Sequence, residues 1–119
     1  VLIYMRIIVY GSLRRNQGNH HWMTYAQLLG EYKLAGYKLY DLGFYPAVVE
    51  GDGEIECEVY RITPSILTEL DELKKNDQDY KRQLISTPYG SAWIYLYQKP
   101  VDGLREIKSG DWLKRHEEE

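Results

Sequence analysis

Residues 6–15 read RIIVYGSLRR, a β-branched apolar run that ends abruptly in a glycine and then turns polar and basic. A run of this kind is typical of a buried strand. Gly11 has no Cβ, so a ligand can approach the backbone closely at that point. The hydroxyl of Ser12 and the amides that follow it can hold an anion without any formal charge. The stretch therefore predicts a site for a carboxylate or a phosphate, with an ordinary strand-to-turn junction as the alternative interpretation.

Composition sets the class of protein and limits the class of partner. A chain of 119 residues is long enough for one hydrophobic core. We predict a single domain over residues 5–113, followed by a frayed charged tail over residues 114–119. The net charge of −3, from 15 basic and 18 acidic residues, gives no reason to expect nucleic acid or an anionic membrane. We therefore expect neither of them as a partner.

Cysteine usage and hydropathy bear on the compartment. A single cysteine, Cys57, excludes an internal disulfide and a zinc site built from cysteines. Cys57 alternates with charged neighbours, so we expect it to be a small packing residue. No apolar run approaches the roughly 18 residues that a membrane-spanning helix needs. Residues 1–4 lack the basic segment that begins a signal peptide, and together these features predict a cytoplasmic protein.

Alternating polar and apolar residues predict a chain dominated by strands. The expected strands cover residues 5–10, 32–40, 47–49, 54–61, 80–87 and 91–98. Turns are predicted at residues 51–53 and 88–90, because glycine and proline break the alternation there. The pattern favours an antiparallel sheet that is strongly curved or barrel-like.

Two short helices are predicted to interrupt the strands. The first covers residues 19–28, with Asn19 as its N-cap and Gly30 positioned to end it. The second begins after Thr63, which caps a helix whose first residue is Pro64. Its apolar residues lie at helical spacing, so we expect this helix to pack on the sheet. The sequence therefore predicts an α+β fold.

No metal site is predicted. His20 and His21 are adjacent, so on a helix their side chains diverge by about 100° and cannot chelate one metal ion well. Surface positions near the start of a helix are the expected setting of both histidines.

The order of five spaced motifs is more specific than any one of them. The motifs are Tyr10-Gly11-Ser12-Leu13, Tyr45-Pro46-Ala47-Val48, Glu58-Val59-Tyr60, Leu70-Asp71 before Tyr80-Lys81-Arg82, and Gly110-Asp111-Trp112. With this order the sequence resembles the gamma-glutamylcyclotransferase-like family, in particular its small bacterial members. The resemblance runs from about Met5 to Trp112, which is nearly the whole chain.

The resemblance implies a small mixed, mainly antiparallel β-barrel, flanked by two or more short helices and with a cavity at its mouth. In catalytic members, the Tyr-Gly-Ser/Thr-Leu loop binds the α-carboxylate end of a γ-glutamyl group through backbone amides. Those enzymes release 5-oxoproline and a free amine. The substrate's own α-amino group attacks its γ-carbonyl, and a carboxylate of the protein carries the proton. Carried over to this chain, Tyr10, Gly11, Ser12 and Leu13 are the substrate-binding candidates, and no cofactor is expected.

One position departs from the family pattern. In active members the catalytic glutamate stands four residues after the leucine of the Leu-Asp pair, and here that position is Lys74. A lysine ammonium, with an ordinary pKa of about 10.4, is already protonated at neutral pH and cannot accept the proton. Loss of a positioned acid–base group typically slows a reaction about 10²–10⁴-fold.

A displaced carboxylate is the candidate replacement. Asp77 and Asp79 lie in the polar segment after the second predicted helix, where one of them could fold back toward the loop. Asp79 is the predicted catalytic residue, because the strand that begins at Tyr80 fixes it more firmly. Glu72 lies on the helix and is expected to point elsewhere. The alternative is that these are solvent-facing loop charges, as such runs usually are.

Three functions therefore remain open. The first is a gamma-glutamylcyclotransferase, or a related γ-glutamyl enzyme, that uses Asp79 or another displaced group. The second is a catalytically silent module that keeps the amide cradle for a small carboxylate. The third is a scaffold or interaction protein that has inherited the fold. A carboxylate facing the amides of Gly11 and Ser12 across a cavity would favour the enzyme.

Overall fold

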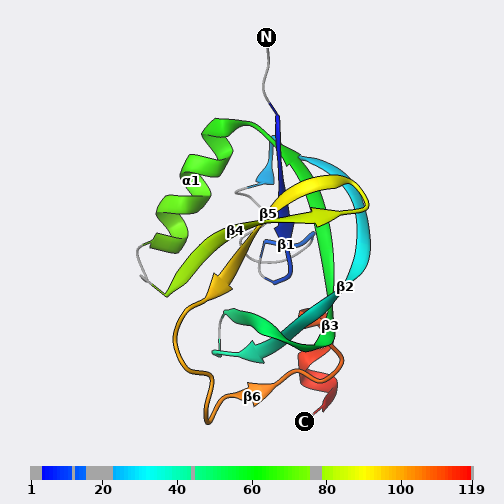
Figure 1. Ribbon diagram of the computed structural model, residues 1–119, viewed down its shortest axis with the longest axis vertical. Helices are drawn as coiled ribbons and strands as arrows, with labels where there is room; N and C mark the ends of the chain where they lie inside the picture. Colours follow the sequence, from blue (N-terminus) through cyan, green and yellow to red (C-terminus); the bar gives the residue numbers. More distant parts are fainter. Residues whose placement is uncertain (1–3, 12, 16–22, 44, 76–78, 119) are drawn as a thin grey trace.

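Six strands form one curled sheet in the order β4-β5-β1-β3-β2-β6 (Figure 1). The computed structural model describes residues 4–11, 13–15, 23–43, 45–75 and 79–118. The strands are β1 (Met5–Val9), β2 (Gln27–Asp41), β3 (Pro46–Ile62), β4 (Tyr80–Thr87), β5 (Gly90–Tyr97) and β6 (Arg105–Glu106). Helix α1 (Pro64–Lys75) joins β3 to β4, and the 3-10 helix η2 (Trp112–Glu118) follows β6.

Strand β1 lies inside the sheet between two strands that run in different directions. It pairs antiparallel with β3, where Val9 lies opposite Glu58, and parallel with β5, where Ile7 lies opposite Trp93. The apolar residues at the end of β1 are buried, and so are Tyr10 and Leu13 after it. The loop that follows β1 therefore begins inside the molecule.

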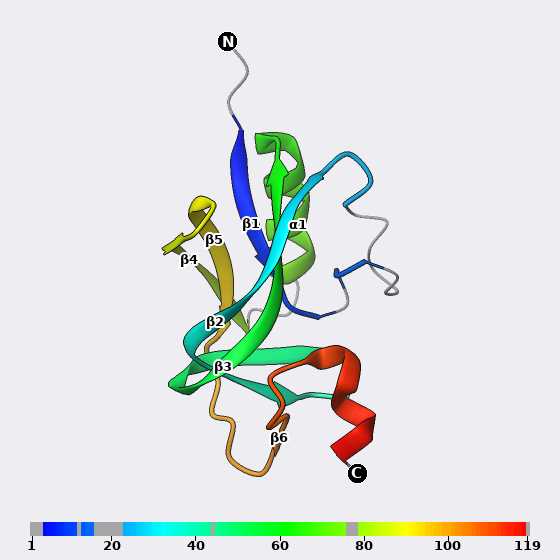
Figure 2. The same ribbon diagram turned by 90° about the vertical axis from the view of Figure 1, so that its right-hand side faces the viewer.

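The two faces of the sheet bury separate sets of side chains, because successive residues of a strand point to opposite faces. The face toward α1 includes Ile7 and Tyr60, which share a cluster with Leu70 of α1. The opposite face includes Ile8 and, from η2, Trp112. Figure 2 shows α1 beside β1 toward one end of the molecule and η2 close to β6 at the other. Leu13, in the loop after β1, belongs to the set on the face toward α1, whereas Tyr10 belongs to the opposite set.

Helix α1 begins where the sequence predicts it. The Ile66 N–H donates to Oγ1 of Thr63 at 3.4 Å, as expected of an N-cap, and Pro64 occupies the first helical position. The apolar residues Ile66, Leu67 and Leu70 are buried. The prediction that this helix packs on the sheet is confirmed.

Strand β2 takes the place of part of the first predicted helix. The helix predicted over residues 19–28 is wrong at its end, because β2 begins at Gln27 and continues through Gly30. Residues 16–22, which include both predicted helix-start histidines, lie outside the described residues. The pairing of β2 with β3 shifts register between Leu28 and Gly30. This bulge interrupts the period of two, and apolar residues at helical spacing imitated a helix.

The turn predicted at residues 51–53 is also wrong, since β3 runs through these residues as one strand. The curvature lies instead in the pairing with β2, which shifts register between Ala35 and Tyr37. Gly36 at this shift has a φ of 93°, a conformation that favours glycine. Glycines at 51 and 53 therefore mark a bent strand and not a chain reversal.

The predicted α+β class with a mainly antiparallel, curled sheet is confirmed. The strands predicted over residues 80–87 and 91–98 correspond to β4 and β5. Two or more short helices are expected, whereas α1 is the one α-helix that the described residues form. Residues 114–118, predicted to be frayed, continue the 3-10 helix η2. Among the described residues, no helix has the length and apolar character needed to span a membrane.

Candidate ligand-binding site

A cleft opens beside the loop that follows β1. It is lined by residues from three segments of the chain: Ile8, Val9, Tyr10, Gly11, Leu13, Pro46 and Tyr95. Its empty space, including the part open to solvent, is about 270 Å³, and the part that admits the centre of a water-sized group is about 10 Å³. Three of the four predicted substrate-binding residues, Tyr10, Gly11 and Leu13, thus meet at one cleft. The fourth, Ser12, lies outside the described residues.

Gly11 lies directly against the ring of Pro46. A Cβ at Gly11 would overlap with Cγ and Cδ of that ring. The absence of a side chain at Gly11 is therefore needed for contact with Pro46, a member of the second sequence motif. The sequence predicted that a ligand approaches the backbone closely at Gly11. In the structure, the Pro46 ring of the protein makes this close approach.

Tyrosine hydroxyls fix the walls of the cleft. The Tyr10 hydroxyl donates to the backbone oxygen of Tyr95 at 2.6 Å, and the Tyr80 hydroxyl donates to the backbone oxygen of Pro46 at 2.8 Å. Burial raises the pKa of Tyr10 well above its ordinary value, and the nearby Tyr80 and Tyr95 raise it further. Tyr10 is therefore a neutral hydrogen-bond donor at physiological pH, and that donor is already in use.

Asp71 of the Leu-Asp motif connects α1 to the wall behind the cleft. Its two carboxylate oxygens each accept a hydrogen bond at 3.0 Å from the Arg82 guanidinium. The Tyr95 hydroxyl donates to Oδ1 of Asp71 at 2.8 Å. The Arg82 guanidinium also lies over the Trp93 ring, 4.1 Å from its centroid. Asp71 and Arg82 thus hold α1 on the β4–β5 hairpin.

The two arginines after the loop pair with carboxylates of the protein. Arg14 is buried and contacts Oε2 of Glu58 at 2.9 Å and Oδ1 of Asp111 at 3.0 Å. The Arg15 guanidinium, which is half exposed, pairs with Glu31. The backbone is engaged as well: the Arg14 N–H donates to the Gly11 oxygen at 2.9 Å, and the Arg15 N–H donates to Oε1 of Glu58 at 3.1 Å. Two of the amides that follow Ser12 are therefore used within the protein.

Glu58 is the residue of this region to which the sequence assigned no role. It lies in the predicted strand over residues 54–61, where it could equally face solvent, and only the pairing of β1 with β3 places it beside the loop. Burial by itself would raise the pKa of Glu58, but hydrogen bonds from Arg14, from the Arg15 N–H and from the Tyr60 hydroxyl leave it below its ordinary value. Glu58 is thus a buried, ionised carboxylate.

The predicted catalytic residue, Asp79, does not line the cleft. Asp79 precedes β4 and forms an ion pair with Lys99, with 2.7 Å between Oδ1 and Nζ. Lys74 is the penultimate residue of α1, and its side chain lies outside the described part of the structure, as does the whole of Asp77.

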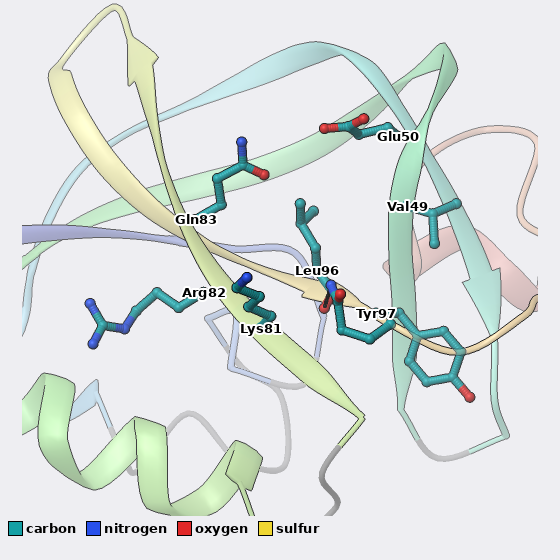
Figure 3. A pocket seen from close by; sticks show the side chains of 8 residues that line it. Val49, Glu50, Lys81, Arg82, Gln83, Leu96 and Tyr97 are labelled. Carbon is teal, nitrogen blue, oxygen red and sulfur yellow. Dashed lines mark hydrogen bonds between the residues drawn. The ribbon is translucent and has the colours of Figure 1, made fainter.

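A wider groove lies between β3 and the β4–β5 hairpin (Figure 3). Its volume is about 610 Å³, and its lining residues are Val49, Glu50, Lys81, Arg82, Gln83, Leu96, Tyr97 and Gln98. Figure 3 shows the Glu50 and Gln83 side chains turned toward the same space, whereas the Arg82 side chain extends away toward α1. Tyr10, Gly11 and Leu13, the described residues among those predicted to bind substrate, do not line this groove.

Comparison with known families accounts for the motif order. Residues 7–114 match the family model described as gamma-glutamyl cyclotransferase, AIG2-like. The chain belongs to this family. The resemblance inferred from the five motifs is therefore confirmed over nearly the whole chain.

Relatives of known structure share the fold of this family member. The gamma-glutamylcyclotransferase family protein YtfP of Escherichia coli K12 is 61% identical over 111 residues, which are 93% of this chain and 98% of YtfP. Its solution structure covers 94% of this chain and 99% of its own, with a TM-score of 0.80. The crystal structure of PH0828 from Pyrococcus horikoshii is 32% identical and covers 96% of this chain and 94% of its own, with a TM-score of 0.86. A putative gamma-glutamylcyclotransferase of Vibrio cholerae is 43% identical over 92% of this chain and 96% of its own.

Proposed function

We propose that this protein binds a γ-glutamyl compound, or another small carboxylate, at the cleft beside Tyr10, Gly11 and Leu13. The supporting observation is that these residues of one family motif line a single cleft at the end of a buried strand. Pro46 of a second motif lines the same cleft and lies against Gly11. Two motifs that are 35 residues apart by number, from Gly11 to Pro46, thus serve one place.

The charges around the loop indicate how an anion would be held. Arg14 is engaged by Glu58 and Asp111, and Arg15 is engaged by Glu31. Recognition by a free guanidinium is therefore not the arrangement that these contacts favour. The Arg14 and Arg15 N–H groups are used within the protein, so the Ser12 hydroxyl and main-chain N–H groups earlier in the loop are the proposed donors. Because the space for a water-sized group is about 10 Å³, a carboxylate oxygen enters and the rest of the ligand lies in the open part of the cleft.

Turnover to 5-oxoproline is a second candidate, favoured by relatives that are described as putative gamma-glutamylcyclotransferases. In that reaction the α-amino nitrogen of the γ-glutamyl group bonds to its γ-carbonyl carbon. The bond to the amine breaks, and the amine leaves with a proton. Asp79 stays the prediction for the proton carrier, and its ion pair with Lys99 would have to open for that role. The proposed setting is the cytoplasm.

The test combines binding and turnover in the same samples. The purified protein is mixed with γ-glutamylalanine, with 5-oxoproline or with the α-methyl ester of γ-glutamylalanine, and thermal unfolding and 5-oxoproline release are followed. We expect the two free acids to raise the unfolding temperature and the ester, which lacks the α-carboxylate, to have no effect. Turnover would add 5-oxoproline release that is lost in Asp79→Asn. No thermal shift with any acid would contradict the proposal and leave the scaffold function.

A further inference from the structure

Glu58 is a buried carboxylate beside the loop that follows β1. Its side chain is 2% exposed, and it lies on β3 opposite Val9, the last residue of β1. Three groups donate to its two oxygens: the Arg14 guanidinium at 2.9 Å, the Arg15 N–H at 3.1 Å and the Tyr60 hydroxyl at 2.8 Å. A buried carboxylate is stable only when it is paired in this way.

Two of these three donors belong to the chain that immediately follows the ligand loop. One is a side chain and the other is a backbone amide, so Glu58 contacts the residues after Leu13 at two different atoms. Because Glu58 accepts hydrogen bonds at two points of this segment, it restricts both the position and the orientation of the peptide. The preceding residues are fixed from the other side, because β1 is paired with β3 and β5. The loop is therefore held at both ends by β3 or its neighbours.

Asp111 extends the same contact to the C-terminal segment. Its Oδ1 accepts from Arg14 at 3.0 Å and from the Leu113 N–H at 2.9 Å, at the start of η2. Arg14 thus lies between a carboxylate of β3 and one of the Gly-Asp-Trp motif. This explains why an arginine directly after the loop is buried even though it carries a full charge.

We propose that Glu58 is a positioning residue for the candidate ligand site, and that it sets the orientation of the loop amides through Arg14 and Arg15. The inference rests on the proposed function for its ligand. Glu58 does not exchange protons in this role, because its oxygens already accept three hydrogen bonds. A folded protein without this carboxylate keeps the cleft residues but presents the loop amides in several orientations.

The test compares Glu58→Gln with Glu56→Gln. Glu56 lies two residues earlier on β3 and pairs at 3.5 Å with Lys33, whose side chain is 68% exposed, so it is a matched control of the same strand and charge. Amide hydrogen exchange is measured by residue, and γ-glutamylalanine binding is measured by calorimetry. In Glu58→Gln we expect exchange at residues 10–15 to rise about tenfold relative to α1, and the Kd to rise about tenfold. Glu56→Gln is expected to match the wild type in both.

Each result decides one of the two proposals. Unchanged loop exchange in Glu58→Gln, or an equal rise in the loop and in α1, would overturn the positioning role. If the wild type binds neither a γ-glutamyl compound nor 5-oxoproline, the proposed function is contradicted. Faster loop exchange in Glu58→Gln would in that case still support the positioning role. If Glu58→Gln does not fold, Arg14→Lys replaces it. This variant keeps the positive charge, but a lysine lacks the forked donors that let Arg14 contact both carboxylates. The same rise in amide hydrogen exchange, confined to the loop, is expected.

Discussion

The cleft after β1 and the groove between β3 and the β4–β5 hairpin differ in size and in how firmly their walls are held. The groove is the larger, at about 610 Å³, and its Glu50, Lys81 and Gln83 side chains are exposed. The cleft is narrow, and its walls are fixed by the buried hydrogen bond of the Tyr10 hydroxyl and by the close fit of Gly11 on Pro46. Ligand sites combine sufficient volume with a few polar groups in defined positions, so volume alone would favour the groove. The proposal places the ligand in the cleft because residues of two family motifs line it and none of these residues lines the groove.

Substitution of Arg14 is expected to have the largest effect, and it tests whether buried ion pairs hold the loop beside the cleft. Arg14→Ala leaves Glu58 and Asp111 without their shared cation, and Glu58 stays buried. Removing one partner of a buried ion pair costs about 3–5 kcal/mol of unfolding free energy. Urea unfolding measures this loss. Lys33→Ala is the control, because its exposed pair with Glu56 is expected to contribute about 1 kcal/mol or less. Arg15 is unsuitable, since its Nε lies 3.9 Å from Oε2 of Glu58. Equal losses in the two variants would contradict the importance of the buried pair.

A methyl group at Gly11 is expected to have the next largest effect. Gly11→Ala places a Cβ where the Pro46 ring lies, and overpacking of this kind costs about 1–3 kcal/mol. Ligand binding is expected to fall with it, since the loop must move away from Pro46. The double variant Gly11→Ala with Pro46→Ala restores the room, so it should recover part of the unfolding free energy. A strictly additive double variant would show that the two residues do not interact.

Acid is expected to weaken the fold through Glu58. The pKa of Glu58 is lower in the folded protein than the value of about 4.3 in an unfolded chain. This difference stabilises the fold above the unfolded value, and the stabilisation is lost as the pH falls through the folded pKa. Urea midpoints between pH 7 and pH 3 should therefore fall more steeply for the wild type than for Glu58→Gln. The pKa of Asp52 is also lowered, by the nearby Lys38, but Asp52 is present in both proteins. Parallel curves would contradict the assignment to Glu58.

Changes in the groove are expected to be the mildest. Lys81→Glu reverses an exposed charge at the groove, and surface substitutions of this kind usually change stability by less than about 0.5 kcal/mol. The Kd for γ-glutamylalanine should change less than about twofold, because Lys81 does not line the cleft. Calorimetry on this variant tests the comparison directly. Loss of binding would place the ligand in the groove and not beside Gly11.

Local sequence patterns predicted the regular parts of the fold and failed where the sheet bends. Strand β1, the hairpin and α1 carry an uninterrupted period or a cap, so each could be recognised from its own residues. In contrast, Gly30 ends a helix in the sequence pattern but lies in β2. A glycine is needed there because the hydroxyl end of Tyr89 occupies the space where a side chain at this position would start. A contact between residues 30 and 89 cannot be predicted from the few residues that surround either position in the sequence.

The candidate site shows the same division. The loop after β1 could be recognised because Gly11 and Ser12 interrupt an apolar run, and the family resemblance gave the same residues. Glu58 could not, because its role depends on the register that sets it opposite Val9. A shift of that register by one residue would turn Glu58 to the other face of the sheet. The sequence alone predicts the loop, whereas the pairing of β1 with β3 is needed to place the Glu58 carboxylate beside it.

The contact between Arg14 and Asp111 joins positions 97 residues apart, and β1 pairs with β5 across a similar distance. During synthesis on the ribosome, the first strand emerges long before either of these neighbours exists. A nascent chain can pair Arg14 with Glu58 earlier, but the second carboxylate partner of Arg14 is missing until Asp111 has been made, and contacts of such long range are formed slowly. Premature termination before residue 111 would thus yield a chain with the complete recognition motif and an unfinished binding site.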